Sequence, residues 1–123
     1  MVCLALSILA GCASTPAGVA GYDAFKADAS PTRLTGSRDA AQAAQCFEDR
    51  ATFLPLSNFS RDAAAGAFTY RLRVSDLWFE EVRITPEGAG SRAELRIAPN
   101  LDAKWLSQFE RDRMGPLRQC LGV

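Results

Sequence analysis

The chain has 123 residues, enough for one domain, and its 14 Lys and Arg residues balance its 14 Asp and Glu residues. Zero net charge gives no basic excess of the kind that nucleic-acid-binding proteins carry. The absence of histidine removes the commonest general base, the Ser-His and Cys-His nucleophile systems and almost every catalytic zinc site. We therefore expect no catalytic residues, no metal site, no cofactor and no nucleic-acid partner.

An uncharged, largely apolar run extends from Val2 to Ala10. A helix of this length rises about 14 Å, whereas a transmembrane helix must cross about 30 Å of hydrocarbon. The run instead has the length of the apolar part of a secretory signal peptide, which we expect over residues 1–11. Because the first Lys or Arg is Lys26, the positively charged start of a signal peptide is missing. We expect the true translation start to lie upstream of Met1.

The apolar run ends in Leu9-Ala10-Gly11-Cys12, which resembles the lipobox that bacterial lipoprotein signal peptidase recognises. The resemblance covers the start of the chain. It implies cleavage before Cys12, a diacylglyceryl group on the Cys12 thiol and acylation of the new amino terminus, a combination that anchors a protein stably in a membrane. Ala13 after the cysteine implies, by the sorting rule of enteric bacteria, the inner leaflet of the outer membrane, facing the periplasm. The alternative is that Cys12 is a small apolar residue at the end of a buried segment.

Ala, Gly, Ser, Thr and Pro make up most of the segment from Ala13 to Gly36. Such a composition buries too little surface to offset the entropy cost of ordering the chain. We therefore expect residues 12–36 to be the lipidated cysteine and a flexible tether, and residues 37–123 to be the folded domain.

The folded domain begins with a helix-forming segment, Ser37 to Arg50, behind a candidate N-cap. Residues 52–56 contain a proline that restricts them to an edge strand or an extended connection. Alternation of apolar and polar side chains predicts strands over 67–75, 78–85 and 93–97 with short connections, typical of an antiparallel meander. A second helix is predicted over 104–114 and is expected to break or kink at Gly115-Pro116. The order predicts an α+β two-layer sandwich: helix, three- or four-stranded antiparallel sheet, helix.

Two cysteines, Cys46 and Cys120, remain once Cys12 is lipidated and Cys3 lies in the signal peptide. Cys46 lies on the first helix and Cys120 follows the second, so helices that share a sheet face would bring them together. In an exported chain this pattern favours one disulfide joining the helices. A pair of buried free thiols is the alternative.

Leu77, Trp78 and Phe79 are three bulky apolar residues in a row at the start of a predicted strand. If Trp78 faces the same way as Val82, Leu77 and Phe79 lie on the solvated face and form a candidate partner surface. The alternative is a β-bulge near Glu80, or a covering loop, that returns both side chains to the core.

Charged side chains in the same strands show no catalytic pattern. Glu80 and Glu81 point to opposite faces of a strand, so they cannot share a substrate. We expect one of them to be solvated and the other to lie at an edge or bulge. Arg71 and Arg73 are expected to pair with Glu81 or Glu94 across a solvated face.

The combination of lipid, tether and small disulfide-linked domain is similar in layout to secretin pilotins and outer-membrane assembly accessories. The leading hypothesis is a non-enzymatic binding or envelope-assembly module, anchored through Cys12, that holds an envelope protein at its sheet face or at an edge strand. The alternative is a small carrier or sensor of a hydrophobic or cell-wall ligand, bound between sheet and helices. An enzyme ranks third, because the sequence shows no convergent carboxylates.

Overall fold

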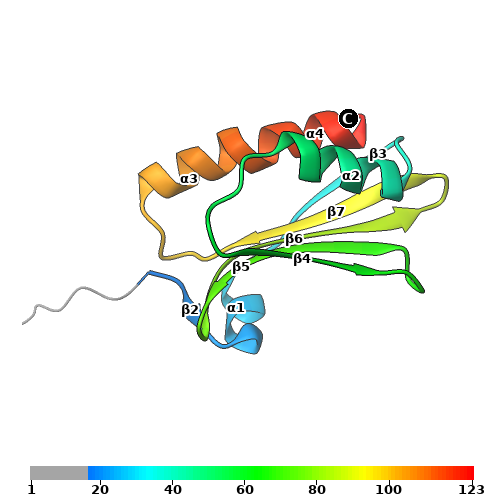
Figure 1. Ribbon diagram of the computed structural model, residues 1–123. Helices are drawn as coiled ribbons and strands as arrows, with labels where there is room; N and C mark the ends of the chain where they lie inside the picture. The colour runs from blue at the N-terminus through cyan, green and yellow to red at the C-terminus, as the bar shows by residue number, and fades with distance from the viewer. Residues whose placement is uncertain (1–16) are drawn as a thin grey trace, which may run out of the picture.

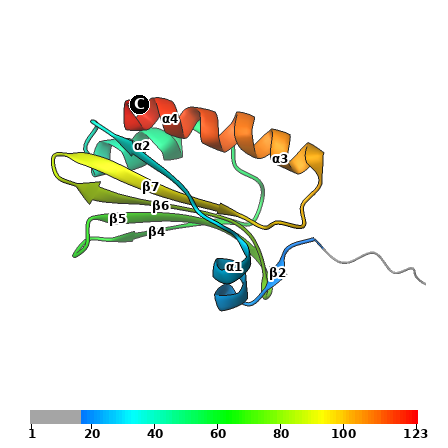
Figure 2. The same cartoon turned by 180° about the vertical axis from the view of Figure 1, so that it is seen from behind.

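The computed structural model describes residues 17–123, so the expected signal peptide over 1–11 and Cys12 lie outside the described residues. The described chain forms two layers, an antiparallel sheet and a layer of helices that covers one of its faces (Figure 1, Figure 2). The α+β class is therefore confirmed. The predicted sheet of three or four strands is wrong, because the sheet has six strands within residues 17–123 alone.

The strands and helices alternate in the first half of the described chain, and a meander and a long C-terminal helix follow. The strands are β2 (Val19–Ala20), β3 (Thr32–Gly36), β4 (Ser57–Asp62), β5 (Ala67–Val74), β6 (Leu77–Glu87) and β7 (Gly90–Ile97). The helical segments are α1 (Tyr22–Asp28), α2 (Ala40–Arg50), α3 (Ala103–Phe109), the π-helical turn η1 (Glu110–Met114) and α4 (Gly115–Leu121). The strand order is β3-β7-β6-β5-β4, with β2 paired to β6.

Residues 19–36 belong to the fold, which corrects the expected tether over 12–36 and the expected domain start at Ser37. β3 pairs with β7, and β2 pairs with the beginning of β6. Between these strands α1 buries Phe25 completely, with its ring centroid 5.9 Å from that of Trp78. A segment of mostly small residues is ordered here because its few large side chains are buried by residues distant in the sequence.

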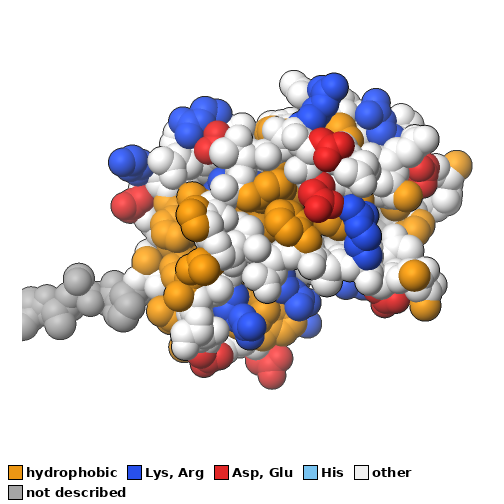
Figure 3. All heavy atoms as spheres, viewed as in Figure 1, with side chains coloured by type: hydrophobic (Ala, Val, Ile, Leu, Met, Phe, Trp, Pro, Cys, Tyr) orange, Lys and Arg blue, Asp and Glu red, His pale blue; other side chains and the backbone are white. Residues whose placement is uncertain are grey.

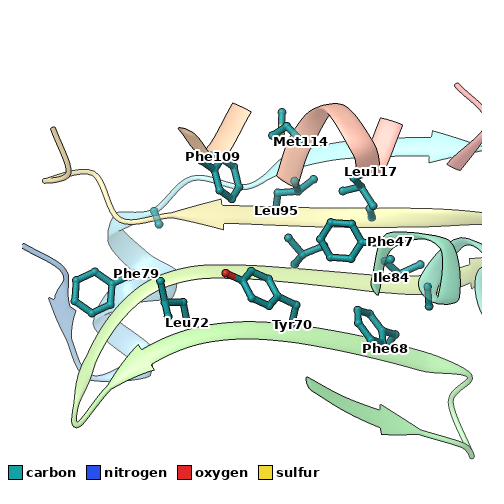
Figure 4. Close-up of a cluster of buried hydrophobic side chains, with 14 of the residues drawn as sticks. Phe47, Phe68, Tyr70, Leu72, Phe79, Ile84, Leu95, Phe109, Met114 and Leu117 are labelled. Carbon is teal, nitrogen blue, oxygen red and sulfur yellow. The ribbon is translucent and has the colours of Figure 1, made fainter. Parts of the chain in front are cut away.

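The three predicted strands are confirmed as β5, β6 and β7, which are successive antiparallel neighbours. Their apolar side chains point from the inner face of the sheet toward α2, α3 and α4. Figure 4 shows the two sets that meet: Phe68, Tyr70, Leu72, Ile84 and Leu95 from the sheet and Phe47, Phe109, Met114 and Leu117 from the helical layer. These side chains fill the space between the two layers.

The predicted disulfide is confirmed between α2 and α4. Cys46 is bonded to Cys120, with the Cα atoms 5.5 Å apart and a sequence separation of 74. The two helices lie on the same face of the sheet, as expected. α2 begins later than predicted, because Asp39 rather than Ser37 is its N-cap and accepts hydrogen bonds from two backbone N–H groups of the first turn.

Of the predicted break or kink at Gly115-Pro116, the break is absent, because the C-terminal helix runs on from α3 through the π-helical turn η1 into α4. Pro116 has no N–H group, so the carbonyl of Asp112 loses its usual helical donor. The backbone N–H of Thr52 donates to the Asp112 carbonyl oxygen at 2.9 Å instead. The wider π-helical turn also precedes the proline ring. A connection from another part of the chain therefore makes the continuous helix possible.

Candidate functional site

The outer face of the sheet, opposite the helical layer, is covered at one end by α1 (Figure 1). Alternation along β5, β6 and β7 places charged side chains on this face in rows across the strands. Arg71, Glu81 and Arg96 form one row, and Thr69, Arg83 and Glu94 form the next. Figure 3 shows blue Lys and Arg side chains below the level of the sheet, beside the region of α1. The outer face is therefore polar and rich in arginine.

A groove of about 290 Å³ opens on the outer face between α1 and β4. We call it the Arg73 groove. Its lining residues are Tyr22, Asn58, Phe59, Ser60, Thr69, Arg71, Arg73 and Trp78. The volume is near the lower end for small-ligand sites, about 300–1,000 Å³. The lining combines two guanidinium groups with hydroxyl and amide groups and contains no carboxylate, so it favours a negatively charged ligand.

Trp78 positions the two arginines of the groove. The guanidinium carbons of Arg71 and Arg73 lie 5.6 and 5.4 Å from the centroid of the Trp78 ring. The Tyr22 ring packs against the same indole, with the centroids 4.6 Å apart. Cation–π contacts hold a guanidinium group in place while its N–H donors remain available at the edge of the planar group.

The two arginines differ in their pairing. Arg71 Nε donates to Glu81 Oε2 at 3.0 Å, and Tyr22 Oη donates to the Glu81 carboxylate at 2.9 and 3.1 Å. Burial raises the pKa of Tyr22, and the hydrogen bond to Glu81 acts in the same direction, so the Tyr22 hydroxyl stays protonated at neutral pH. Arg73, in contrast, forms no hydrogen bond or ion pair with any residue of the described range 17–123. Arg73 therefore supplies the uncompensated positive charge of the groove.

A second polar cluster lies in the dry layer between sheet and helices. Glu80 and Arg113 form a two-point ion pair there, with Arg113 Nε 2.8 Å from Glu80 Oε1 and a terminal guanidinium nitrogen 2.5 Å from Oε2. The Tyr70 hydroxyl and the Trp105 indole N–H each donate to the same carboxylate at 2.8 Å. A further Arg113 nitrogen donates to the Thr52 carbonyl oxygen at 3.1 Å.

The Glu80 cluster is closed to solvent. The side chain of Glu80 is 0% exposed and that of Arg113 is 1% exposed. Burial raises the pKa of Tyr70, and the neighbouring Glu80 charge acts in the same direction, so Tyr70 remains a hydrogen-bond donor. Each oxygen of Glu80 accepts two hydrogen bonds. A fully paired and inaccessible carboxylate stabilises the junction of β6 with the C-terminal helix, and it offers no position for a ligand.

The candidate partner surface at Leu77 and Phe79 is wrong, and the alternative of a β-bulge is correct. The register of β5 with β6 shifts after Leu72, so no residue of β5 lies directly opposite Phe79. The extra residue turns Trp78 to the outer face. Phe79 is 8% exposed and stacks on Trp105 at 5.1 Å. The backbone of Gly18 covers it, since a Cβ at Gly18 would lie 2.9 Å from the Phe79 ring. Leu77 is partly buried against the core.

Both charged sites could be predicted only in part from the sequence. Glu80 and Glu81 do lie on opposite faces, but both are buried rather than solvated. The pairing of Arg71 with Glu81 is confirmed, whereas Arg73 has no such partner. The signal for the groove was available in the alternation of Thr69, Arg71 and Arg73, whereas the run of Leu77, Trp78 and Phe79 left the bulge that brings Trp78 beneath them as an alternative only.

Across residues 17–123, no three His, Cys, Asp or Glu side chains come together in a way that could hold a metal ion. The helices of that range are too short or too polar to cross a bilayer. No protein-family model matches the chain, and no curated protein and no solved structure is significantly similar to it.

Proposed function

We propose that the chain is a lipid-anchored binding module of the bacterial cell envelope that has no catalytic role and holds an envelope protein on the outer side of its sheet. One observation carries the binding role: the Arg73 groove presents an oriented guanidinium group without an acceptor in the described chain. An exposed charge of this kind adds little to the stability of a fold, and it is well suited to recognition of an anionic partner.

The anchor of the proposed module is acylated Cys12 in the inner leaflet of the outer membrane, on the periplasmic side. Residues 13–18 separate Cys12 from the start of β2 at Val19. Even a fully extended chain of this length spans no more than about 25 Å. The module would therefore work close to the membrane surface, nearer than a flexible tether ending at Gly36 would hold it.

A carrier or sensor of a cell-wall ligand is the second candidate, and the volume and polar lining of the Arg73 groove favour it. Here the ligand would lie in the groove on the outer face, whereas the sequence led us to expect it between the sheet and the helices. That space is filled by fully buried side chains, among them Phe47, Tyr70 and Leu117 (Figure 4). A small ligand with a carboxylate or phosphate group fits the groove better than an apolar one.

In-cell photo-crosslinking tests the binding role. A photoreactive amino acid replaces Asn58 in the groove, and in a matched control it replaces Ser107, an exposed residue of α3 on the opposite layer. We expect one envelope protein to be captured from position 58 and not from position 107. Capture of no protein from position 58, or of the same protein from both positions, would refute the binding role of this face.

Metabolic labelling with palmitate tests the anchor separately. We expect label in the parent protein and none in Cys12→Ala, which should also leave the membrane fraction. Equal labelling of the two proteins would show that Cys12 is not the acylated residue.

A further inference from the structure

The Arg73 groove borders β4, which is one of the two edges of the sheet path. Within residues 17–123, β4 pairs with β5 on one side and has no strand on the other. It follows the connection of residues 52–56, and nearly all of its residues are exposed. Figure 1 shows β4 at the front of the sheet with no element beyond it. Its outward N–H and C=O groups can therefore pair with an added strand.

The other edge, β3, is less accessible at one end. A Cβ at Gly36 would lie 2.0 Å from the carbonyl oxygen of Leu121, which shows how closely the end of β3 approaches α4. The backbone N–H of Arg38, just beyond β3, donates to the same oxygen. β4 has no comparable cover and is the better edge for strand addition.

The two sides of an added strand would meet different surfaces. Asn58 and Ser60 lie on the outer side of β4, since they pair with Arg71 and Thr69 of β5. An added strand lies about 4.8 Å from β4 and about twice that from β5, so one of its glutamates meets Arg73 near the start of β4 when the guanidinium turns from Trp78 toward that edge. The side chains of the added strand that lie beside Asn58 and Ser60 on the outer side would therefore face the Arg73 groove.

The charge of the groove selects the side chains on that side. Glu81 neutralises Arg71, and the guanidinium of Arg73 is left without a protein acceptor. A carboxylate is the group that matches the forked donors of arginine. The side chains that face the groove are thus expected to be acidic.

The opposite side of the added strand would meet apolar surface. Phe59 points to the inner side of β4, where its ring packs against those of Phe53 and Phe68, and it remains 40% exposed. Leu56, in the turn before β4, is 66% exposed. Figure 3 shows hydrophobic side chains at the centre of this view, between the helices and β4. Apolar side chains of a partner strand can cover this surface.

We propose that the occupant of this edge is an extended segment of a partner protein, in which acidic residues alternate with apolar ones, added to β4 with its carboxylates directed at Arg73. This proposal rests on the binding function proposed above and names the edge and the chemistry of the partner. A second copy of the chain is a poorer occupant. Antiparallel pairing of two β4 strands would place two Arg73 grooves on the same face of the joined sheet, where their charges repel.

Titration of the purified full chain with synthetic peptides, followed by the amide NMR signals, tests the proposal. The probe is a capped seven-residue peptide in which glutamate alternates with valine. One control replaces its glutamates with lysine, and another replaces its valines with proline, which cannot donate the hydrogen bonds of a ladder. We expect the glutamate peptide alone to bind, to shift the β4 amide signals and to bind more weakly as salt is added.

Two matched variants locate the charge. Arg73→Ser should weaken binding about tenfold or more, as expected for the loss of a charge-assisted hydrogen bond. Arg83→Ser removes an exposed arginine of the same face outside the groove and should leave binding unchanged. Arg83→Ser should unfold at the parent's urea midpoint, and Arg73→Ser should lose no more than about 1 kcal/mol, because neither residue forms an ion pair within residues 17–123 and Arg73 loses only its contact with Trp78.

Several outcomes would overturn the proposal. One is that the glutamate peptide does not bind at millimolar concentration, and another is that the lysine or proline peptide binds equally well. The others are an equal loss of affinity in Arg83→Ser and amide signals that shift in β3 alone. Self-association of the chain that Phe59→Ser abolishes would also do so, because it would make a second copy the occupant. Any of these results would leave the crosslinking test from position 58 intact, so failure of the strand proposal and failure of the binding function are distinguishable.

Discussion

Glu80 and Glu81 are neighbours in β6, but they lie on opposite faces of the sheet and meet arginines in different environments. On the inner face Glu80 and Arg113 are both closed to water, and every oxygen of the carboxylate is paired. On the outer face Glu81 binds Arg71, whose side chain is 40% exposed, while Arg73 beside it has no acceptor. The inner charges are matched within the fold, and the outer ones are left partly unmatched.

The physical consequences of the two arrangements differ. A buried ion pair becomes very costly when one partner is removed, since the other charge remains unpaired in a dry environment. An exposed arginine costs little to remove, because water replaces its contacts. Variants of the inner face should therefore change stability, and variants of the outer face should change binding.

Removing Arg113 should give the largest effect. Arg113→Met leaves Glu80 buried without its counter-charge, and we expect a loss of about 3–5 kcal/mol in the free energy of unfolding. Urea denaturation measures it, with Arg111→Met as the matched control, because Arg111 is 67% exposed and pairs with its neighbour Asp112. The double variant Glu80→Gln, Arg113→Met should lose less than Arg113→Met alone. Equal losses for Arg113→Met and Arg111→Met would contradict the role of the buried pair.

Phe25→Ala tests whether α1, which covers one end of the outer face, is part of the folded domain. Phe25 is completely buried against Trp78, so its truncation should cost about 3 kcal/mol or more through lost burial and a cavity. Thermal unfolding measures the loss, and Phe59→Ala should cost less because the Phe59 ring is partly exposed. An unchanged melting temperature would show that residues 22–28 do not contribute to the folded domain.

The two tyrosines should differ in their effect at alkaline pH. Burial raises the pKa of Tyr70, so the folded state keeps this proton above pH 10 while the unfolded chain releases it. The stabilisation is complete below about pH 10 and falls as the pH rises beyond that value. Tyr70→Phe should remove most of this fall, which is measured as the urea midpoint against pH. At neutral pH the same variant should lose about 1–3 kcal/mol in the free energy of unfolding, because Glu80 loses a hydrogen-bond donor.

Tyr22→Phe is the matched comparison for Tyr70. Its pKa is also raised by burial, but the residue lies at the margin of α1 and is partly exposed. We expect it to remove a smaller share of the alkaline fall. If Tyr22→Phe removed more of the alkaline loss of stability than Tyr70→Phe, the inner face would not be the drier environment.

The surface pair of Glu110 and Arg118 should give the smallest effect. The hydrogen bond from Arg118 lowers the pKa of the Glu110 carboxyl, so its stabilisation is present at neutral pH and is lost as the pH falls below about 4. Because both side chains are well exposed, Glu110→Gln should change the free energy of unfolding by less than about 0.5 kcal/mol at pH 7. A loss comparable to that of Arg113→Met would remove the distinction between buried and exposed pairs.

Local patterns in the sequence predicted the central elements. The alternation in 67–75 identified β5, the helix formers before Arg50 identified α2, and the cysteine count identified the disulfide of Cys46 with Cys120. Each of these depends on neighbours within a few residues or on a count. The same reasoning failed at 19–36, because Phe25 and the β3 backbone find their partners in β6 and β7.

Positions that depend on distant contacts were mispredicted. The helix continues past Pro116 because Thr52 supplies a donor to Asp112. Phe79 is buried because a bulge shifts the strand register and Gly18 covers the ring. Neither contact leaves a periodic signal around the residue that it affects.

The sequence by itself determined an α+β domain with a meander at its centre, a disulfide between two helices, and a chain without histidine chemistry. It also carries the lipobox resemblance at Cys12, which remains a prediction. The tertiary structure alone decided which charges are paired, since that depends on bringing Arg113 to Glu80 and Trp78 beneath Arg73. Electrostatic energies depend on distance and burial in space, and periodicity along the chain records neither of them.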